Sequence, residues 1–120
     1  MPKMIDLPTY SNEKGDLTVV EKILPFDIKR LYYIYHASGI RGGHRHKVTT
    51  QALICVNGSC EVHCDNAVTQ ETFILDSPAK CLIIQPEDYH TMSNFSDNAV
   101  LLVLASHYYD KDDYITESYK

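Results

Sequence analysis

The feature that most limits the possible folds is a series of short segments rich in branched and aromatic residues, each ended by a turn signal. The sequence holds no amphipathic segment of helical length that competes with them. Short, closely spaced strands with turns between them are typical of an antiparallel barrel or a jelly-roll sandwich. We therefore predict an all-β fold, with strands over residues 17–21, 29–36, 51–56, 60–64, 71–75, 80–84, 90–94 and 99–105.

The clearest turn signal lies between the predicted strands 51–56 and 60–64. Asn57 and Gly58 separate the two runs, and an Asn-Gly pair favours the two-residue turn of a β-hairpin. We therefore expect these two strands to form a hairpin. The apolar strand 99–105 is expected to be buried on both faces or against a partner, and the acidic, tyrosine-rich tail 107–120 to form a short helix or an arm.

Length and charge narrow the class of protein. A chain of 120 residues has room for one core, so we expect residues 1–120 to form one domain. The net charge of -5 disfavours nucleic acid and anionic membranes as partners, because both need concentrated lysine and arginine. No apolar run approaches the roughly 18 residues of a membrane span, and no signal peptide is recognisable. We expect a cytoplasmic protein.

The cysteines are expected to be reduced and buried. There are four, at positions 55, 60, 64 and 81, and three of them fall in strand-like segments of a chain without a recognisable secretion signal. Their spacing lacks the paired two-residue knuckles of a structural zinc site. We therefore predict neither disulfides nor zinc at these positions.

The candidate site lies between Arg41 and Gln51. If this segment is extended, alternation puts His44 and His46 on one face, and Gln51 can follow them to the same cavity. Two imidazoles in one pocket can either hold a metal or move protons, because imidazole has the pKa nearest to physiological pH. Arg41 suits a pyrophosphate, since a guanidinium binds phosphate oxygens with two parallel hydrogen bonds.

This segment resembles the first motif of the cupins. The resemblance rests on His44-x-His46, four residues, Gln51, six residues and Gly58, with Gln51 where metal-binding cupins commonly have Glu. The second cupin motif is echoed by Pro86, His90 and Asn94, with the spacing from proline to histidine one residue short.

A closer resemblance is to the deoxysugar 3,4-ketoisomerases, which act on dTDP-4-keto-6-deoxyglucose. It covers nearly the whole chain from Lys29 to Ile115, and one departure is Arg45, where that family usually has Ala. The segments that carry it are Arg41–Lys47, Gln51–Cys55, Asn57–Cys60 and Val103–Asp110.

The resemblance implies a single-domain cupin with a jelly-roll barrel and a metal-independent isomerase that needs no cofactor. Such an enzyme would move the keto group of a dTDP-4-keto-6-deoxyhexose from C4 to C3 through an enediolate. The product would serve the biosynthesis of 3-amino-3,6-dideoxy sugars, in lipopolysaccharide or S-layer glycans. A homodimer is expected from the family.

The resemblance also assigns roles to side chains. It makes His44 the base at carbon, while His46 would orient the substrate or handle the oxygen protons. Tyr33 or Tyr35 would donate to the enediolate oxygen, and alternation alone does not decide which of the two faces inward. We take Tyr33 as the catalytic residue and Tyr35 as a substrate-binding residue. The remaining candidates for substrate binding are Arg41, Arg30, Lys14, Gln51 and His90, the last of which, with Lys14, is a candidate for deciding the face on which C4 is reprotonated.

Two other functions stay open at this point. One is a metal-dependent cupin, a dioxygenase or an isomerase, with His44, His46 and His90 as ligands and Gln51 as a fourth. An amide carbonyl is a weaker ligand than a carboxylate, so Gln51 argues against it. The other is a non-catalytic cupin that binds a sugar nucleotide, for which Arg45 is the only hint in the sequence.

Overall fold

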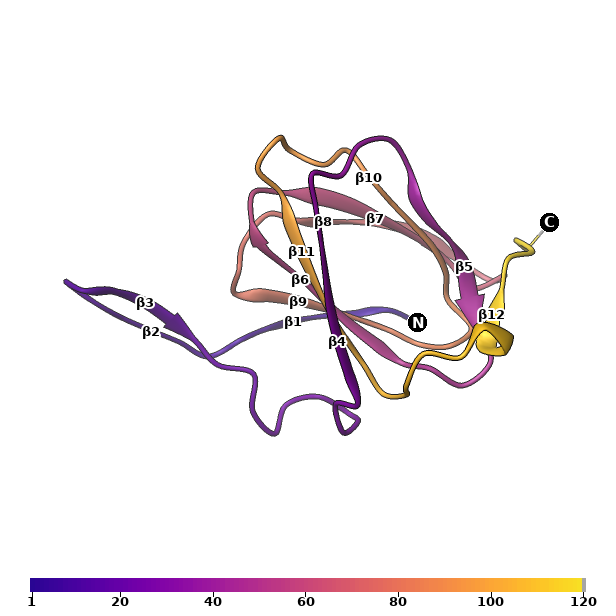
Figure 1. Ribbon diagram of the computed structural model, residues 1–120, viewed down its shortest axis with the longest axis horizontal. Helices are drawn as coiled ribbons and strands as arrows, with labels where there is room; N and C mark the ends of the chain where they lie inside the picture. The colour runs from indigo at the N-terminus through magenta and orange to yellow at the C-terminus, as the bar shows by residue number, and fades with distance from the viewer. Residues whose placement is uncertain (120) are drawn as a thin grey trace.

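The computed structural model describes residues 1–119 as two five-stranded antiparallel sheets and a separate two-stranded hairpin (Figure 1). The sheets face each other as in a jelly roll, which confirms the predicted all-β class. The first sheet has the order β1 (Lys3–Asp6), β9 (Lys80–Ile84), β6 (Gln51–Asn57), β11 (Val100–Ala105) and β4 (Arg30–Tyr35). The second has the order β12 (Tyr114–Ile115), β5 (Arg41–His46), β10 (Tyr89–Ser93), β7 (Cys60–Asp65) and β8 (Gln70–Leu75).

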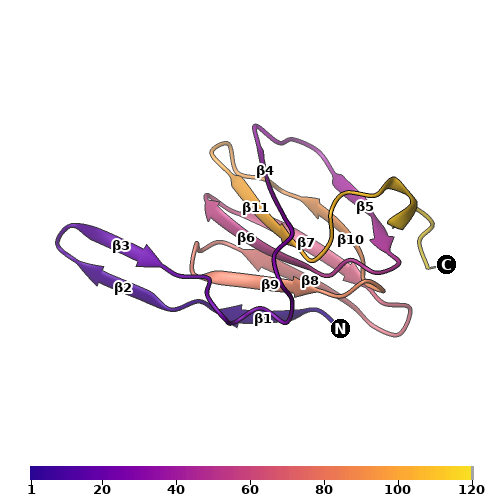
Figure 2. The same cartoon turned by 60° about the horizontal axis from the view of Figure 1, so that its bottom comes forward.

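The hairpin of β2 (Thr9–Asn12) and β3 (Gly15–Thr18) projects from the two sheets (Figure 2). All of its residues except Thr18 are exposed. The sequence places a strand over 17–21, but the observed strand ends at Thr18. The chain after it runs irregularly beneath the first sheet, where Val20 and Phe26 pack as apolar cover.

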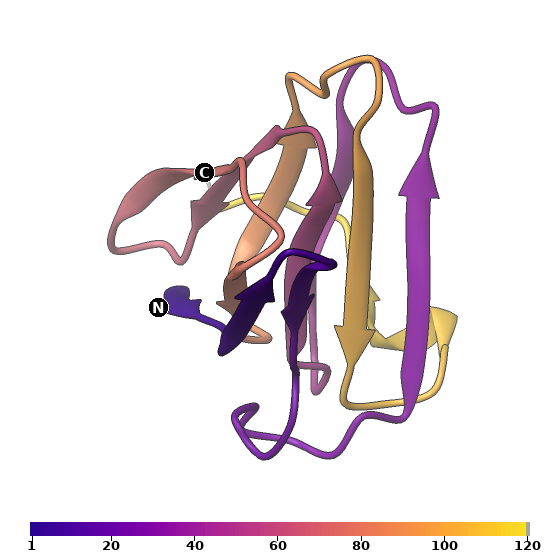
Figure 3. The same cartoon turned by 90° about the vertical axis from the view of Figure 1, so that its left-hand side faces the viewer.

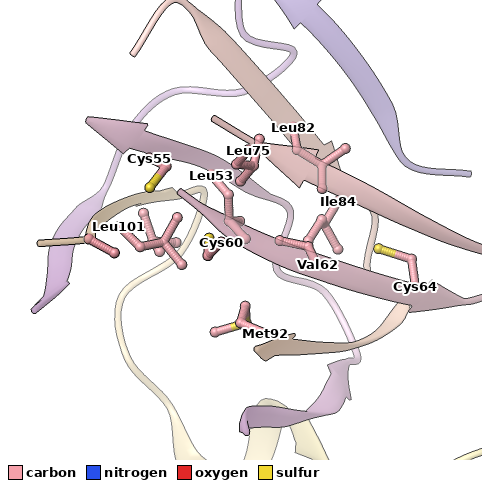
Figure 4. Packing of buried hydrophobic residues seen from close by; sticks show 12 residues of the cluster. Leu53, Cys55, Cys60, Val62, Cys64, Leu75, Leu82, Ile84, Met92 and Leu101 are labelled. Atoms are coloured by element: carbon pink, nitrogen blue, oxygen red, sulfur yellow. The ribbon is translucent and has the colours of Figure 1, made fainter. Parts of the chain in front are cut away.

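The first sheet is covered on both faces. Its inner face is turned toward the second sheet (Figure 3). Between the sheets lies a cluster that includes Leu53, Leu82 and Leu101 (Figure 4). Its outer face packs in a second cluster, in which Ile54 and Leu104 meet the N-terminal segment. Burial on both faces explains why β6 and β11 read as uninterrupted apolar runs rather than as alternating strands.

The predicted hairpin between residues 51–56 and 60–64 is wrong. β6 pairs with β9 and β11 in the first sheet, whereas β7 pairs with β8 and β10 in the second. The turn itself is present, with Gly58 at φ 71°. A Cβ on Gly58 would meet the side chains of Ser96 and Asn98, so the glycine lets the turn pack under the β10–β11 loop and carry the chain from one sheet to the other.

The predicted apolar strand 99–105 is β11, and it lies between β6 and β4. It is therefore covered within its own chain rather than by a partner. The tail contains one 3₁₀ turn, η1 (Lys111–Asp113), and β12, which pairs with β5. Within residues 1–119 no helix has the length and the apolar character to cross a membrane.

Candidate active site

Strand β5 brings His44 and His46 into the space between the sheets. Gly42 has φ 84°, and a Cβ there would lie 3.0 Å from the carbonyl oxygen of His90. The absent side chain thus lets β5 approach β10 closely. The register between β10 and β5 shifts between His90 and Thr91, and His44 faces His90 across the ladder. The histidine of the second motif therefore joins the two of the first, as predicted.

The three imidazoles form one cluster. The ring centroid of His44 lies 5.0 Å from that of His46 and 4.9 Å from that of His90. Burial and the neighbouring His46 lower the pKa of His44 to about 4. Burial lowers the pKa of His90 to about 3, although a hydrogen bond with the Asp88 backbone acts to raise it. The pKa of His46 is also lowered by burial. All three rings are therefore neutral at neutral pH and can accept protons.

The tail supplies two side chains to the cluster that the sequence reasoning missed. Asp113 accepts a hydrogen bond from Nδ1 of His46 at 2.8 Å. The ring of Tyr114 lies 4.8 Å from His44 and 4.7 Å from His46, centroid to centroid. The resemblance extends through both residues, but only the pairing of β12 with β5 reveals that they reach the histidines.

The prediction that Tyr33 or Tyr35 faces the site is wrong. β4 alternates strictly, and both of these side chains are 58% exposed on its outer face. Tyr32 points inward instead, and its hydroxyl accepts a hydrogen bond from Nε2 of Gln51 at 3.1 Å. Which residues face inward depends on the register of β4 against β11, and alternation alone could not supply it.

The site is positively charged on the side of β4. The Arg30 guanidinium lies 5.4 Å from the ring centre of Tyr32 and 5.6 Å from that of Tyr109. Its Nε is buried, and no atom of residues 1–119 pairs with it. Arg41 is exposed at the first position of β5. Burial and the neighbouring Tyr114 raise the pKa of Tyr32, against the opposing effect of Arg30 and Arg41.

One predicted residue, Lys14, lies outside the cluster. It is in the turn of the projecting hairpin, where its backbone N–H donates to Asn12, and this hairpin does not reach the histidines of its own chain (Figure 2). Arg45, the departure from the family pattern, points to the tail. Its guanidinium lies 4.4 Å from the ring centre of Tyr119, and its Nε donates to the carbonyl oxygen of Glu117.

Two of the predicted metal ligands form hydrogen bonds with other side chains. Gln51 is buried and its amide donates to Tyr32, while Nδ1 of His46 is engaged by Asp113. In the described part of the chain, no three His, Cys, Asp or Glu side chains are arranged to hold a metal ion. The site as it stands is a group of neutral bases beside a phenol and a guanidinium.

Comparisons with known proteins agree with this geometry. The family described as FdtA: WxcM-like, C-terminal, matches residues 1–120. A TDP-4-oxo-6-deoxy-alpha-D-glucose-3,4-oxoisomerase of Aneurinibacillus thermoaerophilus is 43% identical over 119 residues, which cover 96% of this chain and 86% of the relative.

Solved structures extend the likeness to the fold. A 3,4-ketoisomerase from Helicobacter canadensis superposes with a TM-score of 0.93 at 38% identity, covering 97% of this chain and 90% of that one. A mutant of the 3,4-ketoisomerase from Thermoanaerobacterium thermosaccharolyticum in complex with TDP-4-keto-6-deoxyglucose has a TM-score of 0.93 at 39% identity, covering 97% and 87%.

Proposed function

Because the chain belongs to the FdtA family and is a TDP-sugar 3,4-ketoisomerase, we propose that it moves the keto group of TDP-4-keto-6-deoxyglucose from C4 to C3 by acid–base catalysis. The observation that carries this proposal is the contact between two neutral imidazoles, His44 and His46, in a site where the charge of Arg30 acts on both His46 and Tyr32. The reaction needs two bases and an acid, and these groups supply them.

His44 acts on the carbon-bound hydrogen. The C3 proton is acidic because C4 carries the ketone, and the neutral His44 imidazole accepts it. The electrons of the C3–H bond form the C3–C4 double bond, and the ketone electrons move to O4. The protonated His44 then delivers a proton to C4. General acid–base transfer of this kind contributes roughly two to four orders of magnitude in rate.

Tyr32 and His46 act on the oxygens. The Tyr32 hydroxyl accepts from Gln51, so its own hydrogen is free to form a hydrogen bond to O4 and stabilise the charge that develops there, without being transferred. Nε2 of His46 accepts the proton of the C3 hydroxyl, and the O–H electrons then form the new ketone at C3. Tyr32 thus takes the role predicted for Tyr33 or Tyr35.

The basic side chains hold the nucleotide. Arg30 has a buried Nε without a partner in residues 1–119 and no neighbouring carboxylate ion pair there, and Arg41 is exposed at the start of β5. Guanidinium groups bind phosphate oxygens with paired hydrogen bonds. We assign both to the pyrophosphate of TDP. Gln51 contributes by orienting Tyr32.

We assign to His90 a role in deciding the face on which C4 of the sugar is reprotonated. It is buried beside His44, so it limits how the sugar ring can approach the base. Lys14 lies in the projecting hairpin of its own chain, and it can take part only in the site of a second copy that this hairpin reaches. Tyr35, on the outer face of β4, is likewise withdrawn from substrate binding.

A homodimer is supported by two exposed features. β4 is an edge strand, and it carries Leu31, Tyr33 and Tyr35 on its outer face, each more than half exposed. The projecting hairpin pairs Tyr10 with Leu17, both exposed, and an isolated two-stranded hairpin is marginally stable in water. Packing these surfaces against a second copy would bury both.

Residues 1–120 would act as one catalytic unit of a biosynthetic pathway in the cytoplasm. The four cysteines are free thiols, as expected in a reducing compartment. A ketone at C3 is the group that an amine requires to form an imine, so the product suits the biosynthesis of 3-amino-3,6-dideoxy sugars. Lipopolysaccharide and S-layer glycans are the proposed destinations.

The two alternative functions are not favoured. A metal-dependent cupin would have Gln51 as its fourth ligand, and an amide carbonyl is a weaker ligand than a carboxylate. A non-catalytic binder does not need neutral bases beside an acid. Elemental analysis tests the first alternative, since metal present in stoichiometric amount and required for activity would establish it.

The direct test is incubation of the purified protein with TDP-4-keto-6-deoxyglucose, followed by NMR of the product. We expect the carbonyl carbon to move from C4 to C3, with a new C4 proton whose couplings give the configuration at that carbon. Binding of the substrate without a change in its spectrum would establish the non-catalytic alternative.

A further inference from the structure

We propose that Asp113 is a positioning residue that fixes His46 in the tautomer with a protonated Nδ1 and a free Nε2, and that this tautomer permits the transfer of the hydroxyl proton from O3 to O4. The proposal rests on the ketoisomerase function given above. It adds to that function a residue of the tail that does not touch the reacting atoms.

Asp113 is a nearly buried carboxylate, 7% exposed, that accepts four hydrogen bonds. Its Oδ1 accepts from the backbone N–H groups of Lys47 at 3.0 Å and Val48 at 2.8 Å. Its Oδ2 accepts from the Thr49 hydroxyl and from Nδ1 of His46. Burial opposes ionisation, but the hydrogen bonds from Thr49, Val48 and His46 outweigh it and lower the pKa of Asp113 to about 2.

An ionised carboxylate has no hydrogen to donate. The 2.8 Å contact therefore requires that Nδ1 of His46 carries the hydrogen. In a neutral ring the other nitrogen, Nε2, is then a free acceptor. Nε2 is buried, and no atom of residues 1–119 hydrogen-bonds to it. A buried acceptor without a partner is costly, so this nitrogen is suited to receive a hydroxyl of the sugar.

The tail holds Asp113 in place through its backbone as well. The 3₁₀ turn η1 ends at Asp113, and Asp110 caps its first residues. The carbonyl oxygen of Asp113 accepts from the N–H of Lys47 at 2.9 Å, and the next residue, Tyr114, pairs with His46 across β5 and β12. The carboxylate is thus fixed to the same strand end that carries its histidine.

With this tautomer, His46 can carry one proton from O3 to O4 and return to its starting state. Nε2 of His46 takes the proton from O3, and the ring becomes an imidazolium with Nδ1–H still bound to Asp113. The negative carboxylate stabilises that positive charge. Nε2 then gives the proton to O4, after which the neutral ring has its original tautomer. The ring neither gains nor loses a proton over one turnover, and Asp113 stays ionised.

The Asp113→Asn variant tests this directly. The Asn carbonyl can still accept from the N–H groups of Lys47 and Val48, while its amide N–H faces Nδ1 of His46 and favours the opposite tautomer. Nε2 would then carry a hydrogen and could not accept one. The equivalent Asp-to-Asn change in the serine-protease triad lowers kcat by about 10⁴-fold through the wrong tautomer.

Two rates separate a positioning role from a structural one. Exchange of the C3 proton with solvent deuterium requires His44 and Tyr32 but no transfer from O3. Asp113→Asn should therefore lower the formation of the 3-keto product by about 100-fold or more and leave C3 exchange much less affected. The matched control is Asp112→Asn, an exposed neighbour in the same turn, which should change neither rate. Equal losses of exchange and product formation would overturn the proposal.

A measurement on the wild-type protein tests the proposal without requiring that any variant folds. The ¹⁵N shifts of the imidazole nitrogens report the tautomer of each histidine, and His46 should show a protonated Nδ1 and an unprotonated Nε2 near neutral pH. The opposite tautomer would overturn the proposal whatever the variant does. If the wild-type protein neither exchanges C3 nor forms product, the ketoisomerase function fails, while the tautomer of His46 is still measured.

Discussion

The space between the two sheets has two halves that differ in chemistry although the same strands build both. The apolar half contains Ile34 of β4, Leu53 of β6 and Met92 of β10. The polar half contains the residues two positions earlier on the same strands, Tyr32, Gln51 and His90. The change from apolar to polar occurs within single strands, so the fold assigns stability and chemistry to opposite ends of one framework.

The apolar and polar halves depend on each other. Clustered aliphatic side chains exclude water, and this burial lowers the pKa of His44 and His90 and keeps them neutral. The polar half, in turn, holds groups such as Nε2 of His46 without a partner in residues 1–119, at a cost that the apolar half must offset.

Replacing His44 by Asn removes the carbon base from the polar half. We expect kcat to fall by about 10²- to 10⁴-fold, the usual contribution of general acid–base catalysis, because the C3 proton is no longer removed. TDP binding, measured by calorimetry, should be retained, since the phosphates are held by Arg30 and Arg41. Persistent C3 exchange in this variant would remove His44 as the base.

Replacing Leu101 by Ala attacks the apolar half. The side chain is fully buried, and we expect unfolding in urea to show a loss of about 2–5 kcal/mol, the cost of lost burial and of the cavity left behind. The kcat of the folded enzyme should be nearly unchanged. A large loss of kcat without a loss of stability would show that the two halves are not separable in this way.

The two faces of β4 offer a matched pair of variants. Tyr32→Phe removes the inward hydroxyl that Gln51 orients and should lower kcat by about 10²-fold, as for the loss of one donor to a developing oxyanion. Tyr33→Phe removes the hydroxyl of the next residue, which points outward, and should leave kcat unchanged. Initial rates of both variants check the assignment of Tyr32 as the hydrogen-bond donor. A larger loss of kcat in Tyr33→Phe than in Tyr32→Phe would return that role to Tyr33.

The neutral histidines also predict a pH dependence of stability. His90 titrates near pH 6.5 when unfolded but at about 3 when folded, mainly through burial. Between these values the unfolded chain binds a proton that the folded chain does not, so stability falls as the pH falls from about 6.5. His90→Gln should reduce the slope of unfolding free energy against pH by about 1.4 kcal/mol per unit. Identical slopes would contradict a buried neutral His90.

The smallest effect is expected on the rim of the polar half. Arg45→Ala removes the contact with Tyr119 and the hydrogen bond to Glu117. An exposed contact of this type is worth about 0.5–1 kcal/mol, so ¹⁵N relaxation should show greater backbone motion of residues 116–119 while kcat stays constant. Unchanged relaxation of these residues would show that Arg45 does not hold the tail.

Much of this organisation could be predicted from the sequence because alternation and turn residues are local. The positions of His44 and His46 on one face and the run of strands from Arg30 to Ala105 follow from such local patterns. Strand pairing is not local, so the Asn57-Gly58 pair predicts a hairpin although it joins two sheets, and the inward position of Tyr32 rather than Tyr33 or Tyr35 does not follow from alternation alone. Asp113 and Tyr114 reach the histidines only because β12 pairs with β5.

Proton NMR of the wild-type reaction with TDP-4-keto-6-deoxyglucose in deuterium oxide shows most directly whether proton removal occurs at C3. The carbons C3 and C5 are both adjacent to the C4 ketone, but only C3 is assigned a base. We predict that the C3 proton is lost as the 3-keto product forms, while the C5 proton of the remaining substrate is retained. Exchange at C5, or exchange at C3 with no 3-keto product, would contradict the account.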